Sequence, residues 1–335
     1  LRDALGGEQV EIKDDPETHA RQYHYEGYND KNEYDRRTPC DQDFVRKLSR
    51  DTDSDRLESW FGTDVARYFK DQSAYDSEGI FILDGTYLFI PDNEHYEGSH
   101  RGWFDEHNHK ISKEEREKLP PSRQKLCRFR RYYQMTALSH TNRKKDFLLY
   151  AGARVLRWEG HEVKTMVPLV DRFVEAVGRG VMKTLLVDRG FIDGESIRRI
   201  KEKHGVDVVV PLKSKMDITQ DAWKLAEVDG RAWQEWRPPE KTKPPDPPQR
   251  PERLRKAEKN RQKTIAENKE REGVKPRPRL VRVELKLIPR INLWTDCGLP
   301  LDVVLMREYM SDGETSQWGL MTTGEVHDPM EVREL

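Results

Sequence analysis

The chain has little cysteine, few apolar residues and no long hydrophobic run. Only 3 of its 335 residues are cysteine, and Cys40, Cys127 and Cys297 lie far apart. An odd number of distant cysteines argues against a disulfide framework and suits a reducing compartment. Hydrophobic residues make up 35% of the chain, and no stretch approaches the ~18 consecutive apolar residues that could span a bilayer. The sequence therefore predicts neither a membrane protein nor a signal peptide, and we expect a cytoplasmic location.

The chain also has almost no net charge, −1 at pH 7, although 36% of its residues are charged. These charges are unevenly distributed. Residues 1–80 hold 12 basic and 20 acidic residues, whereas residues 110–131 hold 9 and 3, and residues 237–290 hold 18 and 8. Affinity for nucleic acid depends on local positive potential within about 10 Å, roughly one Debye length. The small net charge therefore does not exclude a polyanionic partner.

The N-terminal segment differs in pattern from the segment that follows it. Residues 1–75 are acidic, and we expect irregular structure over about the first 50 because apolar positions are few. A helix is expected near 54–69, with Ser54 as its cap. Residues 76–213 predict, in order, strands at 80–90, 132–137 and 147–155, a helix at 162–177, a strand at 181–188, a helix at 196–203 that Gly205 ends, and a strand at 206–212. This order predicts an α/β fold with a mixed sheet flanked by helices.

The pattern changes again after residue 213. Residues 214–324 predict a β-rich insertion, with strands at 280–288, 300–309 and 316–323. The insertion carries a Pro-rich and charged arm, 237–279, whose seven prolines between 238 and 251 predict a polyproline-rich spacer. Residues 325–335 begin a final helix, because Asp328 followed by proline is a typical helix start.

Two aspartates lie in or at the end of apolar strand patterns. Asp84 lies in the middle of the 80–90 run, and Asp188 follows the apolar residues of 181–187. An aspartate in a buried strand is costly unless it is paired, hydrogen-bonded or bound to metal. If the two strands are neighbours, both carboxylates can face one hard cation such as Mg²⁺. The alternative is that each aspartate is a strand-end residue satisfied by backbone N–H groups.

The segments around these aspartates resemble the first and second catalytic motifs of the DDE transposases of bacterial insertion sequences. The likeness rests on Phe81-Ile82-Leu83-Asp84-Gly85-Thr86 and on Leu185-Leu186-Val187-Asp188-Arg189-Gly190-Phe191. It is to the subgroup with a β-strand insertion between the second and third acids, and it runs from about residue 79 to the end of the chain. The resemblance implies a ribonuclease H-like core in which Asp84 and Asp188 bind Mg²⁺ or Mn²⁺. It also implies hydrolysis and strand transfer at the ends of a mobile DNA element.

The third acid of that family is a glutamate on the helix after the insertion. Here that helix begins at Asp328, and Glu331 and Glu334 lie too early to be that acid. We therefore expect the third acid beyond Leu335 and expect the chain to be a piece of a longer protein. As it stands, the chain would lack part of its active site.

Basic residues next to strand patterns are candidates for DNA contact. One group interleaves cations with aromatic residues and comprises Arg123, Lys125, Arg128, Arg130 and Arg131. Lysine and arginine neutralise phosphates and aromatic rings stack on bases, although a charged run can also be a solvated loop. Lys213 and Lys215 follow the strand beside the proposed carboxylate site and are candidate phosphate contacts.

Histidines gather in the segment 95–109, which we expect to be a flexible loop. His95, His100, His107 and His109 are ligand types that zinc uses. Their spacing fits no standard zinc pattern, and no cysteine pair accompanies them. The sequence therefore gives little support to a zinc site.

The leading hypothesis from the sequence is a metal-dependent DNA transposase, associated with the nucleoid. Its partners would be the terminal repeats of a mobile element and target DNA, and the resemblance implies a dimer on DNA. One alternative is a catalytically inactive DNA-binding protein derived from a transposase. Another is a different ribonuclease H-like nuclease. Joining of the cleaved product to target DNA would separate the leading hypothesis from both.

Overall fold

The computed structural model describes residues 9–14, 21–25, 52–92, 96–145, 147–156, 161–238 and 278–335. Near the N-terminus it contains two short antiparallel strands, β1 (Gln9–Asp14) and β2 (Arg21–Tyr25). The expectation of irregular structure over about the first 50 residues is therefore wrong at these two segments. Nearly all of the arm 237–279 lies outside the described residues.

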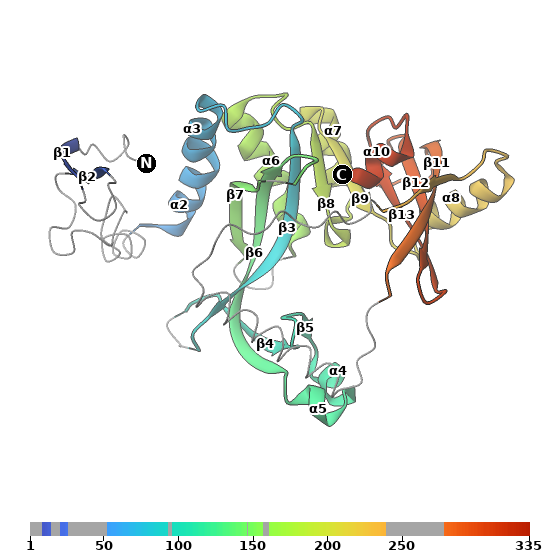
Figure 1. Ribbon diagram of the computed structural model, residues 1–335, viewed down its shortest axis with the longest axis horizontal. Helices are drawn as coiled ribbons and strands as arrows, with labels where there is room; N and C mark the ends of the chain where they lie inside the picture. Colours follow the sequence, from blue (N-terminus) through green and yellow to red (C-terminus); the bar gives the residue numbers. More distant parts are fainter. Residues whose placement is uncertain are drawn as a thin grey trace.

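Five strands form the centre of an eleven-stranded sheet (Figure 1). They are β3 (Ile80–Ile90), β6 (Arg128–Thr141), β7 (Leu149–Leu156), β8 (Thr184–Val187) and β9 (Asp207–Pro211). Their spatial order is β7-β6-β3-β8-β9. The first three are antiparallel to one another, whereas β8 is parallel to both β3 and β9. The mixed sheet, and with it the expected ribonuclease H-like α/β fold, is confirmed.

The later strands continue this sheet beyond β9. They are β10 (Gln234–Trp236), β11 (Leu280–Ile291), β12 (Leu301–Met310) and β13 (Thr315–Thr322). All of them pair antiparallel, and β13 joins β9 with Met321 opposite Val210. Three of these strands lie where the sequence predicts them. The β-rich segment is thus attached to the core through its main-chain hydrogen bonds.

Helices cover both faces of the sheet. One face packs against α6 (Val163–Val177), α7 (Gly194–His204) and α8 (Asp217–Val228), and the other packs against α10 (Pro329–Glu334). Strand β9 illustrates the two-residue alternation, because Val208 and Val210 contact the α6–α8 side whereas Val209 contacts the α10 side. The sequence did not predict α8. No helix in the described ranges is long and apolar enough to cross a membrane.

The expected helix near 54–69 is present as a continuous helical stretch beside α6. It comprises α2 (Ser54–Trp60), a π-helical segment (Phe61–Val65) and α3 (Ala66–Asp71). Its cap is Asp53, not Ser54, since the Asp53 carboxylate accepts hydrogen bonds from the N–H groups of Asp55 and Arg56. Arg172 of α6 donates to Glu58 at 2.9 Å and joins the stretch to the core.

A lobe of small elements is carried by the far ends of β3 and β6, which project beyond the helices (Figure 1). It consists of β4 (His100–Phe104), β5 (Lys110–Ile111), α4 (Lys113–Lys118) and α5 (Pro121–Gln124). Since β4 pairs with the first residues of β6, the expectation of a loop over 95–109 is wrong at 100–104. The expected burial of β3 on both faces holds only up to Leu83, because the strand then leaves the helical layers.

Candidate active site

The two aspartates of the sequence motifs lie at neighbouring positions of adjacent parallel strands. Leu83 of β3 lies opposite Val187 of β8. Asp84 directly follows Leu83 and Asp188 directly follows Val187, so the two aspartates lie at the same level of the sheet. Adjacent strands are about 4.8 Å apart. The sheet topology therefore brings together two carboxylates that are separated by more than a hundred residues in the sequence.

Asp84 is open to solvent on one side, and protein surrounds it on the other. Burial raises the pKa of its carboxyl group, the backbone N–H of Gly85 opposes this shift, and the negative charge of Asp188 adds to it. The Asp84 side chain lies on the opposite face of β3 from Leu83, because side chains alternate along a strand. Asp84 is exposed and lies on the face of β3 opposite the one that packs against α6.

Asp188 directly follows β8 and caps a short 3-10 turn, Arg189–Phe191. One carboxylate oxygen, Oδ1, accepts a hydrogen bond of 2.7 Å from the N–H of Gly190. The alternative in which these aspartates are satisfied by nearby backbone N–H groups is thus partly realised. A single such bond leaves most of the acceptor capacity of a carboxylate unused.

A third carboxylate, which the sequence motifs did not reveal, lies beside these two. It belongs to Glu162, the residue before α6. Burial raises the pKa of Glu162, a hydrogen bond from Gln134 opposes the shift, and the charges of Asp188 and Asp84 add to it. Within the described residues, none of the three carboxylates forms an ion pair with lysine or arginine. The site therefore concentrates negative charge.

These residues fit a hard divalent cation by the chemistry of their donors, which are all carboxylate oxygens. No three His, Cys, Asp or Glu side chains in the described ranges are arranged as a complete metal-binding group. Mg²⁺, however, is commonly held by only one or two carboxylates, with water and substrate phosphate completing its shell. Asp84 and Asp188 fit that arrangement.

Comparison with known protein families bears on this site directly. Residues 159–306 match the family model described as the transposase DDE domain. The matched residues make up somewhat less than half of the chain and include Glu162 and Asp188, whereas Asp84 precedes them. A search of curated proteins finds no match to the chain.

A cavity of about 640 Å³ opens beside Asp188. Its lining comes from both sides of the junction between the core and the added strands: Asp188, Arg189, Pro211, Ser316, Gln317 and Trp318. The pairing of β13 with β9 creates this junction. The cavity therefore adjoins the Asp188 carboxylate and is large enough for one nucleotide-sized group.

The candidate DNA-contacting residues fall into two classes. Arg123 is held by Glu106 through two bonds of 2.6 and 2.9 Å, and Arg131 binds Asp92 at 3.1 Å. Arg130 donates to Asn108 and its guanidinium lies over the ring of Phe89. The other class is exposed and comprises Lys125, Arg128, Lys213 and Lys215. Carboxylates partly neutralise Arg123 and Arg131, so the second class has more positive charge to offer to phosphates.

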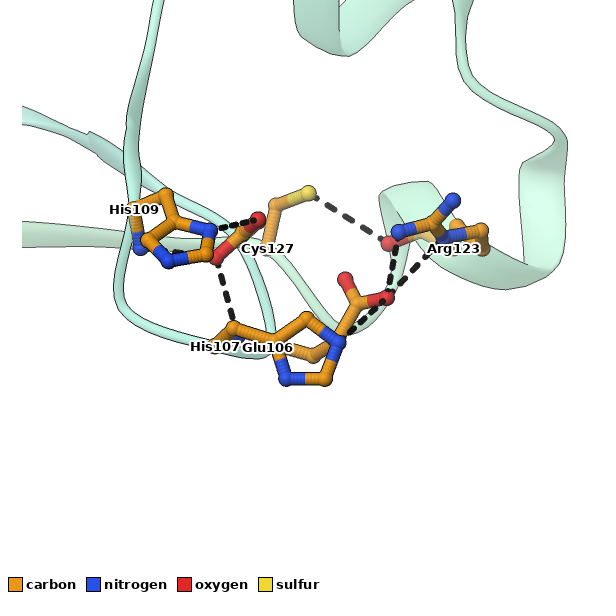
Figure 2. A network of polar contacts seen from close by, with 6 residues as sticks. Glu106, His107, His109, Arg123 and Cys127 are labelled. Carbon is orange, nitrogen blue, oxygen red and sulfur yellow. Dashed lines mark hydrogen bonds and ion pairs between the residues drawn. The ribbon is translucent and has the colours of Figure 1, made fainter. Parts of the chain in front are cut away.

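In the described part of the histidine-rich segment, His107 and His109 lie in a turn that polar contacts close (Figure 2). Asp105 Oδ1 accepts 2.8 Å hydrogen bonds from the N–H groups of His107 and His109. Glu106 is engaged by Arg123, and the Cys127 thiol donates to the Arg123 carbonyl. His95 lies outside the described residues. These contacts fix the connection between β4 and β5.

Proposed function

We propose that the protein is a DNA transposase that hydrolyses phosphodiester bonds at the ends of a mobile element and joins the freed ends to target DNA. The observation that supports this most strongly is the adjacency of Asp84 and Asp188 on neighbouring parallel strands, with Asp188 inside the matched DDE domain. The reaction would depend on Mg²⁺ or Mn²⁺, and the protein would act as a dimer on DNA.

Asp84 and Asp188 would hold the divalent cation through their carboxylates. When bound, such an ion activates the attacking oxygen and neutralises charge on the phosphodiester. The residues of the chain would position the DNA. Lys213 and Lys215 are exposed just after β9, next to the strand that ends at Asp188. Lys125 and Arg128 would contact phosphates farther along the duplex.

The test uses the complete protein and a duplex that carries the terminal repeat of the element. Mn²⁺-dependent cleavage is expected for the parent protein and is expected to fall below detection for Asp188→Asn. This substitution keeps an oxygen that can accept the Gly190 N–H while removing the charge. Glu195→Gln, an exposed residue in the first turn of α7, is the matched control. Undiminished cleavage by Asp188→Asn would refute the assignment.

The same assay separates the alternatives. Tight binding of the terminal repeat with no cleavage by the parent would indicate an inactive DNA-binding derivative. Cleavage without any joining of the product to target DNA would indicate another ribonuclease H-like nuclease. Only a product covalently joined to target DNA supports the transposase.

A further inference from the structure

Gly85 and Gly190 each follow one aspartate of the pair closely, and the carboxylate of Glu162 lies against both glycines. A Cβ atom on Gly85 would overlap Oε2 of Glu162, and a Cβ atom on Gly190 would overlap Oε1 of the same residue. The Cβ on Gly190 would also stand 2.9 Å from Oδ1 of Asp188. The Glu162 carboxylate therefore spans the gap between β3 and the turn after β8.

The position of Glu162 is fixed from two directions. Gln134 of β6 donates a 2.8 Å hydrogen bond from Nε2 to Oε2 of Glu162. The main chain of Glu162 is held by the first turn of α6, where the hydroxyl and the N–H of Thr165 both donate to its carbonyl oxygen. The side chain does not cap α6. Helix capping therefore does not explain why a carboxylate points at this part of the sheet.

Glu162 and Asp84 approach the site from opposite sides. Gly85 lies on the same face of β3 as Phe81 and Leu83, which pack against α6. Asp84 lies on the opposite face of β3, and Asp188 lies level with it on the neighbouring segment, because Leu83 pairs with Val187.

We propose that Glu162 is a further acidic residue of this active site and that it increases the affinity for the divalent cation held by Asp84 and Asp188. This inference rests on the proposed function. It accounts for a half-buried carboxylate that lies beside two others and has no lysine or arginine partner among the described residues. Like charges in one place repel one another, and a cation removes that repulsion.

The test measures ion binding to the 335-residue chain and needs no DNA cleavage. Mn²⁺ alone is titrated, and the free ion is followed by electron paramagnetic resonance. Glu162→Gln is expected to weaken Mn²⁺ binding by about 10-fold or more, the usual effect of losing a residue that supports a metal site. Glu195→Gln, at the corresponding turn of α7, should leave the affinity unchanged.

A second variant tests the geometry. Gly85→Ala places a methyl group where Oε2 of Glu162 lies, so it should displace that carboxylate and also weaken binding. In the Glu162→Gln background, Gly85→Ala should add less than it does alone, because the two changes act on one interaction. Fully additive effects would contradict the proposed arrangement.

Thermal unfolding without metal separates this role from a structural one. Glu162→Gln should be at least as stable as the parent, since it removes a repelling charge and keeps an acceptor for Gln134. A clear loss of stability, or parental Mn²⁺ affinity in Glu162→Gln, would overturn the inference.

If Asp84→Asn and Asp188→Asn also keep parental affinity, or the parent binds no Mn²⁺, the proposed cation site fails as well. If those two variants lose binding and Glu162→Gln does not, only the role of Glu162 is refuted.

Discussion

His140 makes the stability of the strand pair that carries Asp84 dependent on pH. It is fully buried in β6, opposite Phe81 of β3. Its Nε2 accepts a 2.7 Å hydrogen bond from the N–H of Asp76, so this nitrogen carries no proton. Its Nδ1 lies 2.9 Å from the carbonyl of Ile80 and donates to it. The hydrogen bonds thus select one neutral form of the ring.

Protonation of this ring would place a second N–H group against the N–H of Asp76. Burial lowers the pKa of His140 below its usual 6.5, while the Ile80 carbonyl and the charge of Asp76 oppose the shift. The surrounding rings of Tyr75, Phe81 and Phe147 offer no acceptor in exchange. The charged form is therefore disfavoured in the folded chain.

The sign of the effect follows from proton linkage. As the pH falls below about 6.5, the unfolded chain takes up a proton at this position before the folded chain does. The free energy of unfolding then decreases by about 1.4 kcal/mol for each pH unit until the lower pKa of the folded state is reached. Above pH 6.5 the contribution of His140 is fully present.

The assay is urea unfolding between pH 7.5 and 5.5 for the parent and for His140→Gln, which keeps a donor and an acceptor but does not titrate. The variant loses aromatic contacts and should be less stable at every pH, by about 1–3 kcal/mol from two or three ring pairs. Its stability should fall less steeply than that of the parent below pH 6.5. Equal slopes, or an NMR titration in which the folded His140 ring protonates near pH 6.5, would refute the reasoning.

Two further outcomes are expected from other residues. Asp302 is buried and accepts 2.8 Å hydrogen bonds from the N–H groups of Arg290 and Val326. Asp302→Asn should therefore lower the free energy of unfolding, measured in urea, by about 2 kcal/mol, which is the range for losing a hydrogen bond to a charged group. A change below about 0.5 kcal/mol would contradict this prediction. Arg128→Ala should reduce the slope of log affinity for DNA against log salt concentration by about 1. Arg199→Ala, whose guanidinium is paired with Asp171, should leave that slope unchanged.

The core strands could be predicted from the sequence because a strand buried on both faces consists of a continuous run of apolar residues. Apolar runs around Asp84 and Asp188 mark strands covered by helices, and Gly205, in the left-handed conformation, ends α7 as expected. The small errors have local causes. Asp53 and Ser54 are both good capping residues, and the pattern does not distinguish them.

The remaining features depend on contacts between distant segments. Strand β4 has the sequence His-Arg-Gly-Trp-Phe, which lacks alternation, and it forms because the projecting end of β6 offers a free edge. Glu162 lies outside both aspartate motifs, and its relation to Gly85 and Gly190 arises only when α6 packs on the sheet. The only signal in the sequence was a carboxylate at the start of an amphipathic helix.

The strands that follow β9 in the sheet form one side of the cavity beside Asp188. Because β13 pairs with β9 and β9 pairs with β8, a single set of main-chain bonds connects Trp318 and its neighbours to the strand that ends at Asp188. The cavity beside Asp188 is bounded by this continuous sheet rather than by a separate body. A substrate phosphate at Asp188 would therefore meet residues of β13 at a fixed distance. Changes at Ser316 or Gln317 should then alter which DNA is accepted while leaving the binding of Mn²⁺ alone intact.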